Sequence, residues 1–88
     1  MELEGAAGIV TGGNGGLGQR ICHAFAGAGA NVAVVYAQSR NEAENVAGQL
    51  RDSNVKAEAI QCNVTEPQQV QSLVSQVLQT FGRIDFLI

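Results

Sequence analysis

Glycine crowds one short stretch of the chain, residues 10–18, which read Val-Thr-Gly-Gly-Asn-Gly-Gly-Leu-Gly. An apolar pair precedes the stretch and a helical pattern follows it. Bare backbone lets an anion approach closely, and the unpaired N–H groups at the start of a helix can donate hydrogen bonds to it. These residue types in this position predict a binding site for the phosphates of a nucleotide, and for a diphosphate in particular.

Three glycine patterns compete for this stretch. A P-loop requires a lysine and a hydroxyl residue where the chain has Gln19 and Arg20, so this pattern is rejected. The pattern Gly-x-Gly-x-x-Gly is present but weak, because so many glycines satisfy many patterns. The pattern Thr-Gly-x-x-x-Gly-x-Gly fits better, since its first glycine follows the strand directly. Its members are Thr11, Gly12, Gly16 and Gly18.

The alternative is a glycine-rich turn that binds no ligand. The position of the turn argues against this alternative, because it joins a first strand to a first helix. Doubly wound sheets bind nucleotides at this point.

The end of the second expected strand carries the next polar residues. A carboxylate there would bind the ribose hydroxyls of an adenosine and repel a 2′-phosphate. The chain has Tyr36 instead, and no acid follows before Arg40. The Ser39 hydroxyl and the Arg40 guanidinium could hold a 2′-phosphate, which favours NADP(H) and leaves NAD(H) possible. The alternative is that Arg40 is a solvated residue at a helix start, where a cation is unfavourable unless an anion is bound.

A third candidate contact follows the third expected strand, at Asn63 and Val64. In doubly wound sheets this point lies beside the adenine ring. The side-chain oxygen of Asn63 can accept a hydrogen bond from an exocyclic amine, and Val64 can pack on the ring. The alternative is that Asn63 only turns the chain.

Hydrophobic periodicity predicts the elements that position these residues. Short apolar runs predict strands at residues 6–11, 31–36, 55–62 and 84–88, with helices at 17–28, about 40–51 and 66–81 between them. Gly8 weakens the first strand, and the alternating third strand suits a sheet edge. Strict alternation predicts an α/β fold, a Rossmann-like doubly wound parallel sheet with strand order 3-2-1-4.

Helix faces and ends can be predicted as well. Ser39 or Asn41 is expected to cap the second helix, Thr65 and Gln68 to form a capping box, and Pro67 to lie in the first turn of the third helix. The third helix carries an apolar stripe from Val70 to Phe81. The inward face of the first helix is predicted to be Leu17, Ile21, Ala24, Phe25 and Ala28. That of the second helix is predicted to be Ala43, Val46, Ala47 and Leu50.

Composition narrows the class of protein. The 88 residues carry a net charge of −3, which offers no basic face to nucleic acid. No apolar run approaches the ~20 residues of a membrane span. The acidic start, residues 1–5, lacks the features of a signal peptide, so a cytoplasmic location is expected. Cys22 and Cys62 are isolated thiols, expected to be reduced and structural, and no metal site is predicted.

Taken together, four segments resemble the N-terminal part of a short-chain dehydrogenase/reductase. They are the glycine turn, residues 29–32 before the valine-rich strand, residues 62–65 (Cys-Asn-Val-Thr), and residues 81–88 (Phe-Gly-Arg-Ile-Asp-Phe-Leu-Ile). The resemblance covers essentially the whole chain. It implies a Rossmann fold and hydride transfer between NAD(P) and a carbonyl or alcohol. Within the family, residues 36–40 resemble NADPH-preferring members such as 3-oxoacyl carrier-protein reductases and some ketose or polyol reductases.

The resemblance also implies a set of cofactor-binding residues. Two of them depart from the family pattern. Gly15 stands where NADPH-preferring members often have Arg or Lys, and Asn63 stands where the family usually has Asp, so its adenine contact is expected to be weaker. The expected cofactor-binding residues are Gly12, Asn14, Gly15, Gly16, Leu17, Gly18, Tyr36, Ser39, Arg40, Asn63 and Val64.

The family's acid/base chemistry uses a Tyr, a Lys four residues later and a Ser. Tyr36 and Lys56 are the only Tyr and Lys in the chain, and their spacing is wrong, so no catalytic residue is expected within it. Residues 1–88 are therefore expected to be a truncated dinucleotide-binding part of a single Rossmann domain. The complete protein is expected to be a homo-oligomer that acts on a small carbonyl or alcohol. The alternatives are a catalytically inactive nucleotide-binding module and a nonfunctional truncated product.

Overall fold

The computed structural model describes residues 3–88, in which four strands and three helices alternate along the chain. Met1 and Glu2, which belong to the acidic start considered above, lie outside the described residues. Within residues 3–88, none of the helices is long and apolar enough to cross a membrane. The strands are β1 (Ala7–Thr11), β2 (Asn31–Tyr36), β3 (Ala57–Gln61) and β4 (Phe86–Leu87). The helices are α1 (Gly16–Gly27), α2 (Arg40–Arg51) and α3 (Pro67–Phe81).

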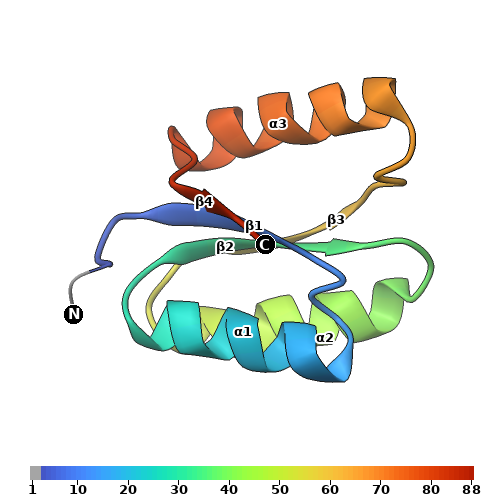
Figure 1. Ribbon diagram of the computed structural model, residues 1–88. Helices are drawn as coiled ribbons and strands as arrows, with labels where there is room; N and C mark the ends of the chain where they lie inside the picture. Colours follow the sequence, from blue (N-terminus) through green and yellow to red (C-terminus); the bar gives the residue numbers. More distant parts are fainter. Residues whose placement is uncertain (1–2) are drawn as a thin grey trace.

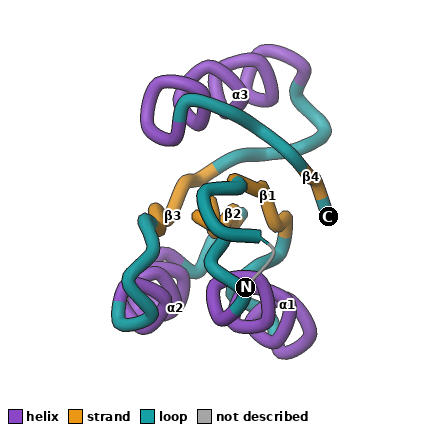
Figure 2. Tube along the Cα trace, turned by 90° about the vertical axis from the view of Figure 1, so that its left-hand side faces the viewer, coloured by secondary structure: helices purple, strands orange, loops and turns teal. Residues whose placement is uncertain are grey.

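The sheet is parallel throughout and has the order β3-β2-β1-β4, which confirms the predicted Rossmann-like topology. Helices α1 and α2 cover one face of the sheet and α3 covers the other (Figure 1). The view along the strands shows the same three layers (Figure 2). Because all strands run in the same direction, the turns after β1, β2 and β3 meet at one edge of the sheet.

The second strand is buried on both faces, as its continuous run of valines predicts. Val32 and Val34 pack in the core beneath α1 and α2, while Ala33 and Val35 pack in the core beneath α3. All four are at most 1% exposed. The central strand therefore fixes the sheet against both helix layers and holds its own carboxyl end, Tyr36, in place.

The fourth strand is held to β1 by more than its two assigned residues. The N–H groups of Asp85 and Ile88 donate to carbonyls of β1, and the Asp85 carboxylate accepts from the Ala7 N–H at 2.9 Å. The Phe86 ring lies over Gly8, where an added Cβ would come within 1.8 Å of it, and stacks on Phe25 of α1 at 4.0 Å between centroids. Gly8 thus makes room for an aromatic pair.

The predicted inward face of α1 is wrong at Leu17 and Ala24, whereas Ile21 and Phe25 are partly buried and pack against the core as predicted. Leu17 is 73% exposed and Ala24 is also exposed, whereas Cys22 and Ala26 are buried. The helix approaches the glycine turn so closely that a Cβ on Gly18 would lie 2.0 Å from the Gly12 carbonyl oxygen. The start of α1 therefore lies against the backbone of the glycine turn, and the Leu17 side chain there is exposed to solvent.

The predicted capping box at α3 is also wrong. Glu66 occupies the N-cap, and the Thr65 hydroxyl donates instead to the Asn63 side-chain oxygen at 2.6 Å. Gln69, rather than Gln68, reaches back and accepts from the Asn63 N–H. Thr65 bonds to Asn63 instead of capping the helix, because Asn side chains compete well for nearby backbone and hydroxyl donors. Pro67 lies in the first turn as predicted.

The remaining helix predictions are confirmed in part. The inward face of α2 is as predicted, with its four expected residues buried. Ser39 occupies the N-cap of α2 but makes no capping hydrogen bond, and Asn41 lies inside the helix. The apolar stripe of α3 is buried at Leu73 and Val77, but Val74 and Leu78 are 37% and 46% exposed. The structure therefore leaves one flank of α3 uncovered.

Candidate dinucleotide-binding site

A hollow of about 480 Å³ lies at the carboxyl edge of the sheet. It is bounded by the glycine turn, by the segment after β2 and by the segment after β3. Five of the expected residues line it, whereas Gly15, Gly16, Leu17, Gly18, Arg40 and Asn63 do not. The five that do are Gly12, Asn14, Tyr36, Ser39 and Val64. Three segments far apart in the sequence thus meet at one site.

The carbonyl groups of the glycine turn are occupied by bonds within the chain. The Gly12 oxygen accepts from the Gly15 N–H, and the Gly15 oxygen accepts from the Gln19 N–H. The Asn14 oxygen accepts from the Gln19 side-chain amide at 2.7 Å. The Gly13 oxygen lies 3.9 Å from the Cys22 sulfur.

The N–H groups of the turn show the opposite pattern. Among the described residues, those of Asn14, Gly16, Leu17 and Gly18 donate to no acceptor of the chain. Gly16–Gly18 form the first turn of α1, whose N-terminus carries the positive end of the helix dipole. A row of unpaired donors at a helix N-terminus is an anion-binding arrangement.

Two glycines of the turn are required by its shape. Gly12 has φ +65°, a conformation that side chains disfavour. Gly18 is in contact with the Gly12 carbonyl, as described above. Gly16, in contrast, has open space where a Cβ would stand. The fold therefore explains Gly12 and Gly18 but not Gly16.

The segment after β2 forms the second wall of the hollow. Tyr36 is buried, at 6% exposure, and its carbonyl accepts from the Cys62 N–H. Ser39 is half-buried and Arg40, the first residue of α2, is exposed. No acidic side chain occurs from Tyr36 to Arg40. A phosphate on the ribose would therefore meet no carboxylate from this segment.

The third wall contains Val64, which is 55% exposed and lines the hollow. The preceding Asn63 turns the chain: its side-chain oxygen accepts from both the N–H and the hydroxyl of Thr65. The chain-turning role that stood as an alternative for Asn63 is thus present in the structure.

Two glutamines at the site were not predicted. Gln19 bonds the glycine turn, and Gln61, opposite Tyr36 in the strand register, donates from its side chain to the Ala37 carbonyl at 3.1 Å. The pairing that places Gln61 beside the end of β2 becomes visible only when the strand register is known. Gln19 could have been suspected because it directly follows the last glycine.

Cys22 lies beneath the turn and is fully buried. Burial raises the pKa of its thiol to about 11, against a weaker lowering by a backbone hydrogen bond. The thiol therefore stays protonated at neutral pH and acts as a small core residue. Both Cys22 and Cys62 are free and buried, as expected for structural cysteines.

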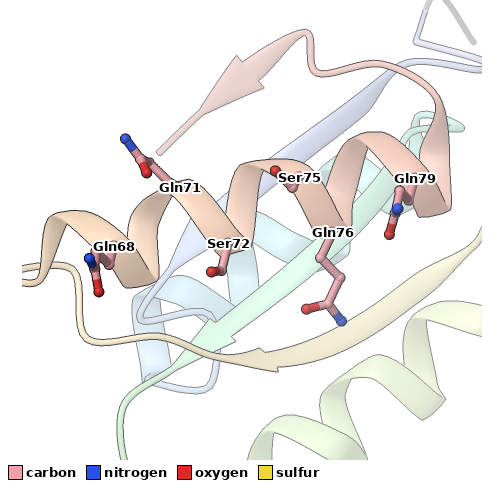
Figure 3. Close-up of a pocket in the computed structure, with 6 residues that line it drawn as sticks. All are labelled: Gln68, Gln71, Ser72, Ser75, Gln76 and Gln79. Atoms are coloured by element: carbon pink, nitrogen blue, oxygen red, sulfur yellow. The ribbon is translucent and has the colours of Figure 1, made fainter.

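A larger hollow, of about 670 Å³, lies elsewhere, along the exposed side of α3. Only uncharged Gln and Ser side chains line it, and Figure 3 shows them along a single helix. It touches none of the three segments that meet at the carboxyl edge. The edge hollow is bordered by the glycine turn, which leads into the unpaired donors of α1, so it is the better candidate for a nucleotide site.

This fold and this site define a Rossmann-type α/β protein of the dinucleotide-binding class. The family model described as short chain dehydrogenase matches residues 7–88. The chain therefore belongs to the short-chain dehydrogenase family.

Individual relatives agree with this assignment. Sorbose reductase of Candida albicans is 39% identical over 89 residues, covering 100% of this chain and 31% of that protein. The 3-oxoacyl-[acyl-carrier-protein] reductase of Staphylococcus epidermidis (strain ATCC 12228) is 38% identical over 80 residues, covering 91% of this chain and 33% of that protein. The chain thus spans about a third of the length of these relatives.

Solved structures show the same fold. An NAD⁺-bound xylitol dehydrogenase superposes with a TM-score of 0.92 at 30% identity, covering 99% of this chain and 33% of that one. The NADPH-dependent 3-quinuclidinone reductase of Rhodotorula rubra has a TM-score of 0.89 at 35% identity, covering 97% of this chain and 32% of that one. Relatives of this fold thus include users of either cofactor.

Proposed function

We propose that residues 1–88 are the N-terminal, cofactor-binding part of a single Rossmann domain in an NAD(P)-dependent oxidoreductase. The observation that carries the proposal is the row of unpaired N–H groups at the start of α1, directly after a glycine turn that borders one hollow together with the segments after β2 and β3. The complete enzyme transfers a hydride between the cofactor and a small carbonyl or alcohol. It is a cytoplasmic homo-oligomer, and its catalytic residues lie outside this chain.

The residues present fit a dinucleotide. The N–H groups of Gly16, Leu17 and Gly18 hold the diphosphate, with Gly12, Asn14 and Gly15 shaping the turn around it. Gly16 supports this role, because the fold alone gives no reason for a glycine there. The bound nicotinamide supplies the hydride chemistry, and this chain binds and orients the other half of the cofactor.

The adenine lies against Val64. The Asn63 side-chain oxygen already accepts two bonds from Thr65, so an adenine amine would have to compete for it. Its side-chain N–H₂ has no partner among the described residues and can donate to a ring nitrogen. Asn63 therefore contributes by holding Val64 in place and by this donor.

The cofactor is NADP(H) in preference to NAD(H). The support is the lack of a carboxylate from Tyr36 to Arg40, together with the hydroxyl of Ser39 and the exposed cation of Arg40. A 2′-phosphate placed here would accept hydrogen bonds from both side chains and would also lie near the N-terminus of α2.

The variant Arg40→Asp tests the cofactor assignment in the complete protein. It replaces a cation with a carboxylate that repels the 2′-phosphate and accepts from ribose hydroxyls. We expect the ratio of NADPH to NADH affinity to fall about tenfold or more, measured by cofactor fluorescence. Lys56→Asp, an equal charge change at the opposite edge of the sheet, should leave the ratio unchanged. Unchanged ratios in Arg40→Asp would remove Arg40 from the site.

The enzyme assignment is tested by sequencing the native transcript past the codon for Ile88. A downstream Ser and a Tyr-x-x-x-Lys motif in frame support an active reductase. A chain that continues without them and still binds the cofactor is a nucleotide-binding module. A protein that binds neither cofactor contradicts the proposed function.

A further inference from the structure

We propose that Gln19 is a positioning residue for the cofactor diphosphate, which it never needs to touch. This inference rests on the proposed function and concerns the peptide unit between Asn14 and Gly15. The carbonyl of that unit accepts from the Gln19 side-chain amide at 2.7 Å, and its N–H donates to the Gly12 carbonyl at 3.0 Å. Both polar groups of the peptide are thus bonded.

The second bond alone would hold this peptide weakly. Gly15 has no side chain to oppose a change of φ, so a peptide between Asn14 and Gly15 can rotate at small steric cost. Gly15 is extended at φ −79°, ψ 170°, and an added Cβ would meet only the Gly12 oxygen, at 3.4 Å. The neighbouring fold therefore does little to fix this peptide, and the Gln19 amide supplies the missing restraint.

The direction of this peptide matters to an anion. The next N–H groups along the chain, from Gly16 to Gly18, are the unpaired donors. If this peptide rotated, the Asn14 carbonyl oxygen would lose its donor. Its partial negative charge would then lie beside these N–H groups and repel a phosphate. Gln19 keeps that oxygen hydrogen-bonded and holds the unpaired N–H groups in place before the diphosphate binds. Binding therefore costs less conformational entropy.

The donor group of Gln19 is the essential feature. Gln19→Met has a side chain of similar length with no N–H, so it keeps the packing and loses the bond. Gln76→Met makes the same change on the outer face of α3, away from the turn, and serves as the matched control. Both are compared with wild type in the complete protein.

Two ligands separate this role from a general loss of structure. NADPH contains the diphosphate, whereas adenosine 2′-monophosphate contains only the part that meets the segments after β2 and β3. We expect Gln19→Met to weaken NADPH about three- to tenfold, with adenosine 2′-monophosphate unchanged. With NADPH as the varied substrate, KM should rise while kcat stays near wild type.

Each other outcome overturns the inference. Wild-type NADPH affinity in Gln19→Met removes the positioning role, and an equal loss for both ligands assigns Gln19 to general stability. If the wild-type protein binds neither ligand, the proposed function fails together with the inference. Failure of the inference alone is recognised because the wild-type protein still binds NADPH.

Amide hydrogen exchange gives a second measurement that needs no cofactor. In Gln19→Met the Gly15 N–H should exchange faster, because its peptide is held at one end only. The Gly13 N–H donates to the Val35 carbonyl of the neighbouring strand and should exchange at the wild-type rate. Equal exchange of Gly15 in both proteins contradicts the proposal. If Gln19→Met fails to fold, Gln19→Glu, whose side chain also lacks an N–H donor, is used for the same amide exchange measurement.

Discussion

At the scale of single residues, the glycines of the turn separate into those that the fold requires and those for which the fold alone gives no reason. Gly18 is in contact with the Gly12 carbonyl, whereas Gly16 has open space around it. The same substitution at these two positions should therefore affect different properties of the protein.

We expect Gly16→Ala to fold normally and Gly18→Ala to be destabilised. Alanine at Gly16 adds helix propensity of up to ~1 kcal/mol, but its methyl group occupies the space in which a diphosphate would lie. NADPH affinity should fall about tenfold with the melting temperature retained or raised. Alanine at Gly18 overlaps backbone and should cost ~1–3 kcal/mol or more, measured by denaturant unfolding. Unchanged NADPH affinity in Gly16→Ala would place the diphosphate elsewhere.

Residue types alone predict the glycine turn and the ends of β2 and β3. The bonds of Gln19 and Gln61 cannot be predicted in this way, because glutamine has no strong positional preference and its partners depend on the three-dimensional path of the chain. The exposure of Leu17 was missed for a related reason. The packing of α1 through Cys22 and Ala26 rather than through Leu17 is a tertiary effect that periodicity does not contain.

At the scale of elements, the Asp85 carboxylate strengthens the attachment of β4 to β1, beside the backbone hydrogen bonds that join the two strands. Asp85 accepts from the Ala7 N–H and from two nitrogens of Arg83, both at 2.7 Å. The hydrogen bond from Arg83 is the main cause of a pKa of Asp85 below its ordinary value of 3.8, with the Ala7 bond second. The folded protein therefore prefers the ionised carboxylate.

This preference predicts how stability depends on pH. Above about pH 4 the contribution of Asp85 is fully present, and it is lost as the pH falls through the lowered pKa, because the unfolded chain then binds the proton more readily. Asp85→Asn should be less stable than wild type at pH 7, and the difference should shrink in acid. Urea unfolding at pH 7 and pH 3 measures this change.

The matched control for this prediction is Asp52→Asn, an exposed carboxylate that follows α2. Its stability should track wild type at both pH values. A difference between Asp85→Asn and wild type that stays constant with pH would show that Asp85 acts through shape rather than charge.

Elements were predicted more reliably than their ends. The hydrophobic patterns of the valine-rich β2 and of α2 are each compatible with one buried arrangement only, so both could be predicted. The start of α3 did not, because Thr65 had two competing partners, and the side chain of Asn63 is nearer in sequence than the helix N–H groups. Competition between neighbouring polar side chains decides where such helices begin, and a capping motif alone does not show which hydrogen bond forms.

At the scale of the whole molecule, apolar surface remains exposed around β4 and α3. Leu87 is 67% exposed, Ile88 is 48% exposed and Leu78 is 46% exposed. Among the described residues, β4 pairs on one side only, with β1. An exposed apolar strand edge is a template for pairing with another chain.

We therefore expect the 88-residue chain, expressed alone, to self-associate or to be partly unfolded. Sedimentation velocity should detect oligomers, and Leu87→Lys, which places a charge on the strand edge, should increase the fraction of monomer. Leu17→Lys makes the same change at another exposed leucine and should not. A monomeric chain with cooperative thermal unfolding would contradict the expectation.

The central position of β1 also has a consequence for synthesis. The bond between Ala7 and Asp85 spans 78 residues, so one side of this early strand finds its partner only after all of the residues between them have been made. At ~5–20 residues per second, a ribosome needs about 4–16 s to make the intervening segment. Throughout that interval the nascent strand has an open edge beside the glycine turn. Translation speed and early chaperone binding should therefore influence how much protein reaches the folded state.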